Sequence, residues 1–395
     1  MRKTLNDFIY QSRGVTETGV PKHLKIPDFE LERWKSRRVV PGVTDLTETG
    51  IPEPLRLRDV FREDVLDLVM DYAPICGNET LRGQIAELYK NVDKDNVLAT
   101  SSTSEGNMIA ANACINNGDE VVVQLPAFMQ LPGLAEAIGT RIHYYYLEEE
   151  DRFEPSIDKL NEKVSPKTRA IILNFPNNPT GRILDEKQVK AICEIAEDRE
   201  AWILVDEVYR GIEFEGPFSP SFAEHYDKAV VTSSLAKVWG LAGLRVGWMI
   251  APKSMVEGSA SAYKEYTSLG SSTLSERIAT IVLEKQVRER LVDRGRRLVR
   301  ESFKVFDDWM RTHENVLSWV KPKFGVIALV KHRLGISSTE FSERVYNEKK
   351  IAIVPCDTAF TNLNDYLRIS YCHPPPKLTE ALNKVSEVIQ SVLGH

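Results

Sequence analysis

The sequence has few of the features that would tie a protein to a metal, a membrane or a disulfide framework. Its five cysteines are odd in number, widely spaced and free of any C-x-x-C pair, so neither a disulfide framework nor a zinc site is expected. The seven histidines show no H-E-x-x-H spacing. No apolar run reaches the ~18 residues of a membrane span. These absences favour a reducing, cytoplasmic location away from the membrane.

The chain also lacks an excess of positive charge. It carries 57 acidic and 51 basic residues, a net charge of -6, and no long basic run. An extended nucleic-acid surface is therefore not expected, and any phosphate should be bound locally. Residues 1–13 include Asp7 and have no apolar core, so we expect no secretory signal.

The length of 395 residues leaves room for two domains. We predict an N-terminal arm over residues 1–45 that packs with the smaller domain. A large cofactor-binding domain is predicted over 46–275. Residues 276–395 are predicted to form the small C-terminal domain, which includes a long charged connecting helix.

Several short apolar runs, each predicted to be a buried strand, end in polar or turn-forming residues. One of them, over 97–100, leads through small hydroxyl residues into an apolar-periodic helix. The first N–H groups of a helix lack internal partners and its dipole favours negative charge, so this arrangement forms an anion site. We predict that Thr103 and Ser104 bind a phosphate, although an ordinary helix N-cap explains the same residues.

A lysine and an arginine follow another of these strands. Lys237 comes just after the run over 229–232, at the strand end where open α/β sheets place their chemistry. Arg245 lies eight positions further on. An amine that forms a Schiff base beside a cation that holds a phosphate suits pyridoxal phosphate.

Two further predicted strands carry charged residues. The strand over 202–205 ends in Asp206, and a carboxylate there can keep a pyridine nitrogen protonated. Asp206 and Glu207 together also suit a metal, but no third ligand is evident. Arg368 lies in the middle of the strand over 366–370, a costly placement unless its charge is paired. A structural salt bridge is one explanation of that placement.

Ser234-x-x-Lys237, followed by Gly-Leu-x-Gly-Leu-Arg-x-Gly-Trp, resembles the signature of the class I/II aminotransferases, the fold type I pyridoxal phosphate enzymes. Further stretches in the family's order extend the resemblance from about Tyr72 to Arg368. It implies an α/β fold, with a mostly parallel seven-stranded sheet in the large domain and a smaller α+β domain. The implied cofactor is pyridoxal 5'-phosphate. The implied reaction moves an amino group between an L-amino acid and a 2-oxo acid through a Schiff base on Lys237.

The resemblance also assigns a role to each matched residue. The implied catalytic residues are Lys237, Asp206 and Tyr209, and the further cofactor-binding residues are Thr103, Ser104, Phe128, Asn178, Ser234, Arg245 and Tyr72. Arg368, Asn178 and Gly50 are implied to bind the substrate, Arg368 by holding its α-carboxylate through two parallel hydrogen bonds. Tyr72 is implied to reach the phosphate in the neighbouring subunit of a homodimer; packing within its own loop is the alternative.

At three positions the sequence departs from the family pattern. Ser102 stands where the family usually has glycine, which puts the detail of the phosphate loop in question. Phe128 supplies an aromatic face but lacks the polar group of the usual tyrosine or tryptophan. Cys356 also replaces a glycine, and its side chain is expected to narrow the pocket.

Other reactions and other classes of protein compete with amino-group transfer. The same lysine, aspartate and arginine serve lyases, cyclases and oxidases. The region around Glu48 and Gly50 and the segment near Ser271 loosely resemble capreomycidine synthase, which acts on an arginine derivative; Glu48 would then face a cationic side chain. An aminotransferase-like transcription regulator needs an N-terminal helix-turn-helix, for which residues 1–45 leave no room. A nicotinamide dehydrogenase needs G-x-G-x-x-G, which the chain lacks.

Overall fold

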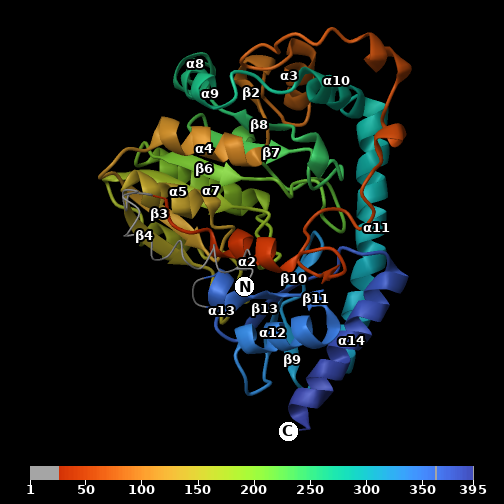
Figure 1. Cartoon of the computed structure of the whole chain (residues 1–395). Helices are drawn as coiled ribbons and strands as arrows, with labels where there is room; N and C mark the ends of the chain where they lie inside the picture. Colours follow the sequence, from red (N-terminus) through yellow and green to blue (C-terminus); the bar gives the residue numbers. More distant parts are fainter. Residues whose placement is uncertain (1–25, 361–362, 395) are drawn as a thin grey trace, which may run out of the picture.

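The computed structural model describes residues 26–360 and 363–394. Residues 1–25 of the predicted arm lie outside this range. Figure 1 shows two lobes, one above the other, with the long helix α11 (Lys285–Thr312) running along both. Among the described residues, no helix combines the length and apolar character needed to cross a bilayer.

The upper lobe is built on a seven-stranded sheet. Its strands are β2 (Val97–Thr100), β3 (Glu120–Leu125), β4 (Arg141–Tyr146), β5 (Thr168–Asn174), β6 (Trp202–Asp206), β7 (Ala229–Ser234) and β8 (Gly247–Ile250). The order is β2-β8-β7-β6-β5-β3-β4, and β8 runs antiparallel to both of its neighbours while the other pairs are parallel. This confirms the mostly parallel sheet. The central strands are buried because helices cover the sheet, so they appear in the sequence as continuous apolar runs.

The helices of this lobe follow the strands in sequence. They are α3 (Glu79–Ala86), α4 (Thr103–Cys114), α5 (Gln130–Ile138), α6 (Ile157–Asn161), α7 (Glu186–Glu197), α8 (Lys253–Met255), α9 (Ser261–Thr267) and α10 (Thr273–Val282). The Asn78 side chain caps α3 by accepting hydrogen bonds from the N–H groups of its first turn. Helix α4 lies along β6, β7 and β8, which places its N-terminus at the carboxyl edge of the parallel strands.

The lower lobe contains a four-stranded antiparallel sheet in the order β12-β13-β10-β9. Its elements are β9 (Leu317–Trp319), β10 (Ile327–His332), α12 (Ser338–Lys349), β11 (Ile351–Ala352), β12 (Val354–Pro355), α13 (Cys356–Ala359), β13 (Tyr366–Ser370) and α14 (Pro375–Leu393). From the N-terminal part, α2 (Glu30–Arg38) contacts α13, and β1 (Thr44–Asp45) pairs in parallel with β11. These contacts fit an arm that packs with the small domain; the domain limits themselves stay a prediction.

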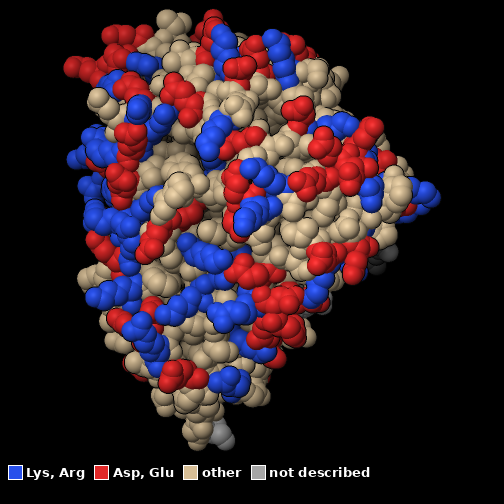
Figure 2. Space-filling model, turned by 180° about the vertical axis from the view of Figure 1, so that it is seen from behind, with Lys and Arg blue, Asp and Glu red and all other residues tan. Residues whose placement is uncertain are grey.

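The long charged run before the lower lobe forms two helices, because the chain takes an extended conformation at Glu284, between α10 and α11. On α11, Arg297 pairs with Glu301 one turn away, and both are largely exposed. Figure 2 shows Lys and Arg intermixed with Asp and Glu over the back of the molecule. Arg297 and Glu301 thus lie on a solvated face, whereas Glu276 on α10 and Asp307 on α11 are buried.

Candidate active site

A cavity of about 470 Å³ opens at the carboxyl edge of the seven-stranded sheet, between this sheet and the lower lobe. The predicted site residues that line it are Thr103, Ser104, Phe128, Asn178, Asp206, Tyr209, Ser234, Lys237, Arg245 and Arg368. They come from both lobes and span more than half of the chain. The fold therefore brings together side chains that the sequence places far apart.

One end of the cavity has the character of an anion site. Thr103 begins α4, and its buried hydroxyl oxygen has no hydrogen-bond partner among the described residues. Ser234 ends β7, and Arg245 follows a short turn in the left-handed region at φ +56°. A Cβ added to Gly247 would lie 2.5 Å from the carbonyl carbon of Ser102, so the loop can pack against this strand only where a glycine stands. Hydroxyls, helix N–H groups and a guanidinium suit a phosphate.

A buried acid lies deeper in the cavity. Asp206 ends β6 and is 5% exposed. Its Oδ2 accepts from the Asn107 side-chain amide at 3.0 Å, and its Oδ1 accepts from the Val208 N–H at 3.0 Å. Burial raises the pKa of Asp206, against the opposing effect of these hydrogen bonds. A cationic N–H group in contact with Asp206 would therefore stabilise its charged form.

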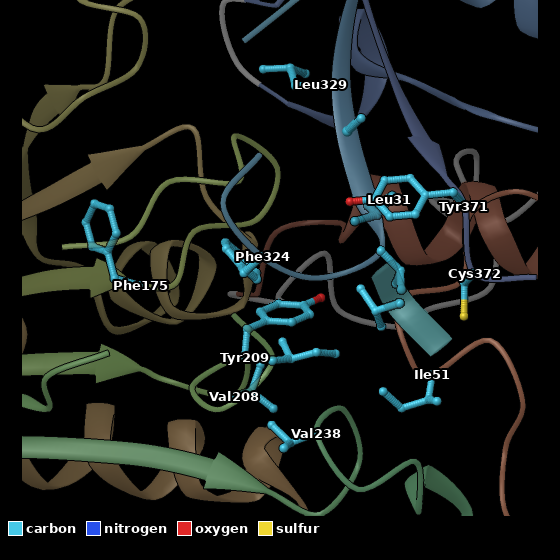
Figure 3. Close-up of a cluster of buried hydrophobic side chains, with 14 of the residues drawn as sticks. Leu31, Ile51, Phe175, Val208, Tyr209, Val238, Phe324, Leu329, Tyr371 and Cys372 are labelled. Atoms are coloured by element: carbon cyan, nitrogen blue, oxygen red, sulfur yellow. The ribbon is translucent and has the colours of Figure 1, made fainter. Parts of the chain in front are cut away.

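Tyr209 and Asn178 stand on the other side of the cavity. Figure 3 shows the Tyr209 ring beside Phe324, with ring centroids 5.4 Å apart. Burial raises the pKa of the Tyr209 phenol above its usual range, so the hydroxyl stays protonated. The Asn178 N–H donates to Asn174 Oδ1 at 3.2 Å, which fixes the loop. Phe128 packs against Phe29 at 4.9 Å between ring centroids.

The Lys237 amine is held by two residues of the segment that follows β1. Lys237 Nζ donates to Thr49 Oγ1 at 2.6 Å and lies 3.8 Å from Glu48 Oε1. Burial raises the pKa of Glu48, but the charges of Lys237 and Lys35 and the backbone hydrogen bonds outweigh this and lower it overall. Glu48 is therefore an ionised counter-ion beside the amine.

Arg368 is a buried cation without a carboxylate partner. It is 1% exposed, and its guanidinium donates to Asn178 Oδ1 at 3.2 Å and to the Thr47 carbonyl at 3.0 Å. Its Nε has no hydrogen-bond partner, and no ion pair in residues 26–360 and 363–394 includes it. The alternative of a structural salt bridge is therefore wrong for the described chain. A buried guanidinium in this state has donors available for a carboxylate.

Residues 65–385 match the model of the family described as aminotransferase class I and II. The chain belongs to this family. It is 30% identical over 343 residues to an aspartate aminotransferase of Pyrococcus horikoshii, covering 81% of this chain and 83% of that one. It is 28% identical over 369 residues to capreomycidine synthase of Streptomyces vinaceus, covering 92% and 94%. The solved structure of a PLP-dependent aminotransferase from Streptococcus suis superposes with a TM-score of 0.87 at 26% identity, covering 93% and 99%.

The predicted recognition, fold type I architecture and enzyme class are thus confirmed: the chain is an aminotransferase that depends on pyridoxal phosphate. The residues of the cavity fit this cofactor. The unpartnered Thr103 hydroxyl faces the anion end, and the buried Asp206 is available to the ring nitrogen.

Two residues that aminotransferase motifs assigned to the site do not line this cavity. Tyr72 is 88% exposed and lines a separate pocket of about 300 Å³ with Thr273 and Arg277. Gly50 is buried behind the cavity wall, where an added Cβ would lie 3.4 Å from Glu48 Oε1. Both roles stay predictions.

Two other side chains turn away from the cavity. Cys356 is buried at the start of α13 and is not part of the lining. Glu207 Oε1 accepts from the Phe222 N–H at 3.0 Å, so the carboxylates of Asp206 and Glu207 do not converge.

Several contacts of this aminotransferase site were not predicted from the sequence. Thr49 accepts a hydrogen bond from the Lys237 amine, and Asn107 donates to Asp206 while accepting from Thr232 Oγ1 at 2.5 Å. One signal for Asn107 was available, since it is a polar residue directly before the mostly apolar part of α4 that begins at Met108. Thr49 gives no such signal, because a threonine beside a glycine is typical of any turn.

Proposed function

We propose that Lys237 is the reactive amine of this aminotransferase and that the cavity moves an amino group between an L-amino acid and a 2-oxo acid. The observation that carries the proposal is that one cavity holds this amine, a buried acid, an anion cradle and an unpaired buried guanidinium. When bound, pyridoxal phosphate supplies an aldehyde for the amine and a ring that withdraws electrons from the substrate α carbon.

The side chains that line the cavity have separate roles in this reaction. Thr103, Ser104, Ser234 and Arg245 hold the phosphate, and Asp206 pairs with the ring nitrogen. Phe128 covers the ring face, while Asn178 and Tyr209 donate to the ring oxygen. Lys237 Nζ, steadied by Thr49, takes a proton from the α carbon of the amino donor and, in the second half of the reaction, delivers a proton to the α carbon of the new amino acid.

Arg368 orients the substrate. A carboxylate facing it would accept from Nε, which has no other partner, and from an Nη group beside it. Because both the carboxylate and the guanidinium lose water there, this contact contributes to the binding of every amino acid and leaves selection to other residues.

A panel of amino donors tested with pyruvate and with 2-oxoglutarate checks the reaction class. We expect stoichiometric formation of the new amino acid and oxo acid, without oxygen uptake and without ammonia release. Ammonia release without a new amino acid would contradict amino-group transfer.

A second candidate reaction is a lyase, cyclase or oxidase acting on an arginine derivative. The ionised Glu48 in the cavity and the similarity to capreomycidine synthase over 92% of the chain favour it. The same panel separates the two reactions. An arginine-type substrate that is converted while the 2-oxo acid is neither consumed nor turned into its amino acid would support the second candidate.

The exposed position of Tyr72 supports a homodimer. Leu66, Val69, Met70 and Tyr72 are each more than 70% exposed, an apolar surface that a second copy of the chain would cover. The Tyr72 hydroxyl would then donate to the phosphate in the neighbouring subunit. Sedimentation velocity should show a dimer, and Tyr72→Phe should weaken cofactor binding. A monomeric wild-type protein, or a Tyr72→Phe variant that binds the cofactor as tightly as wild type, would contradict this.

The five free cysteines suit the proposed cytoplasmic location.

A further inference from the structure

A lysine outside the cavity is buried more completely than Lys237. Lys264, on α9, is 0% exposed. Its Nζ donates to Glu105 Oε2 at 3.3 Å, to Ser268 Oγ at 3.0 Å and to Ser271 Oγ at 3.5 Å. Lysine is almost never fully buried unless it is paired, so its partners indicate what it does.

The first partner, Glu105, holds the phosphate loop. It lies in the first turn of α4, and its Oε2 accepts from the Ser101 N–H at 2.5 Å, at the start of the loop that leads to Thr103. Its Oε1 accepts from Thr267 Oγ1 at 2.6 Å, which ties it to α9. A carboxylate so close to a phosphate site repels the phosphate unless a cation neutralises it, and Lys264 supplies that cation.

A second buried carboxylate lies near enough to Lys264 for the ammonium charge to act on it. Glu276, on α10, is 2% exposed, and its Oε2 accepts from the Asn78 N–H at 2.8 Å. Burial raises the pKa of Glu276, while the Asn78 hydrogen bond and the Lys264 charge oppose the increase. Asn78 follows closely on the segment that carries Tyr72. The Lys264 ammonium thus pairs with Glu105 and acts on Glu276 through its charge. Each of these carboxylates fixes backbone near a residue assigned to a phosphate.

We propose that Lys264 is a positioning residue for the cofactor phosphate. It neutralises Glu105 and thereby holds the loop from Ser101 to Ser104 in its binding conformation. The proposal rests on the assignment of this loop to the phosphate, under the proposed function. Without the ammonium, the Glu105 charge acts on the phosphate and the loop loses its fixed backbone.

Comparing two ligands tests this role. The cofactor-free protein is titrated with pyridoxal phosphate and with pyridoxal, which has the same aldehyde and ring but no phosphate, and binding is followed by absorbance. For Lys264→Met we expect pyridoxal phosphate to bind at least about tenfold more weakly, since a charge-assisted contact near the anion is lost. Pyridoxal binding should change by less than about twofold, because its contacts lie at the ring.

Two further variants serve as controls. Lys264→Met combined with Glu105→Gln removes both charges and should recover most of the affinity for pyridoxal phosphate; it also tests the proposal if the single variant does not fold. Lys321→Met removes another lysine, whose Nζ lies 2.6 Å from Asp307 Oδ1, and should leave both affinities unchanged.

Equal weakening of both ligands in Lys264→Met would show a general structural role and overturn the proposal. So would unchanged affinity for pyridoxal phosphate, or a double variant no better than Lys264→Met. A wild-type protein that binds pyridoxal phosphate no more tightly than pyridoxal would instead refute the phosphate assignment itself.

Discussion

Buried charges are handled differently in two regions of the molecule. Away from the active-site cavity, Arg182 is 3% exposed and donates to Glu154 at 3.0 Å, and Arg210 pairs with Glu224 at 2.9 Å. In the cavity, Arg368 meets only an amide oxygen and a carbonyl oxygen. Asp206 accepts hydrogen bonds only from neutral N–H groups. Arg182 and Arg210 thus have carboxylate partners outside the cavity, whereas the buried Arg368 and Asp206 in the cavity have no direct partner of opposite charge; the partly exposed Lys237–Glu48 pair lies in the same cavity.

The buried charges without a charged partner indicate which charges a ligand of the cavity should carry. Burying an ion without a partner costs several kcal/mol of folding free energy. A ligand of complementary charge would offset this cost. Under the proposed function, the buried Asp206 meets a protonated ring nitrogen and the buried Arg368 a carboxylate, while the exposed Arg245 holds the phosphate. Together these groups match pyridoxal phosphate carrying an amino acid.

Removing the Lys237 amine should have the largest effect on catalytic activity. Lys237→Ala should lower kcat by about 10⁴-fold or more, because it removes both the nucleophile and the proton carrier. Steady-state kinetics with saturating cofactor would measure this. The cofactor should still bind through its phosphate and ring. If activity survives within tenfold, another lysine is the reactive amine.

The next largest effect is expected at the buried acid. Asp206→Asn should lower kcat by roughly 10²–10³-fold, because a preorganised charge opposite the ring nitrogen is lost. Since burial raises the pKa of Asp206 in the folded protein, its ionised form opposes folding above that pKa. The cofactor-free variant should therefore melt at the same or a higher temperature than wild type. A clear fall in its Tm would show that Asp206 is structural.

A matched pair of arginine substitutions tests the comparison itself. Arg368→Leu should raise KM for all amino acids roughly tenfold to hundredfold, the range for a charged hydrogen bond, while leaving the Tm of the cofactor-free protein unchanged or higher. Arg182→Leu should leave the kinetics normal and lower the free energy of unfolding by about 2 kcal/mol. This figure already takes into account that Glu154 is partly exposed to solvent. The comparison fails if both variants lose stability alike.

The smallest effect is expected at Glu48, whose side chain is 46% exposed. Its lowered pKa means that the ionised form stabilises the fold above the unfolded pKa, and that this contribution disappears as the pH falls through the folded pKa. Exposure limits the contribution to less than about 1 kcal/mol. Glu48→Gln should therefore lower the Tm slightly at pH 7 and not at pH 3. An equal fall in Tm at pH 7 and at pH 3 would show that the charge of Glu48 is not the cause.

Much of the site could be predicted because its residues follow strand ends, where the sequence marks both the strand and the turn. Lys237, Asp206 and Asn178 were placed in this way, together with a family motif. Tyr72 was assigned by motif alone, and a single chain does not bring it to the cavity.

The contacts that could not be predicted are those made across long stretches of sequence. Thr49 meets Lys237 across 188 positions, and Asn107 meets Asp206 across 99, and no local pattern records such pairs. The edge strand β4 was missed for a different reason. Three of its six residues are exposed and Tyr145 is buried, so its sequence shows no regular alternation of apolar and polar residues.

Chemical mapping of the cofactor-bearing lysine tests the central claim most directly. The protein is incubated with pyridoxal phosphate, reduced with borohydride, digested and analysed by mass spectrometry. The buried charges without a charged partner in the cavity predict that the modification lies on Lys237, with the buried and paired Lys264 unmodified. Stoichiometric modification at Lys264, or at any lysine outside the cavity with Lys237 left free, would contradict it.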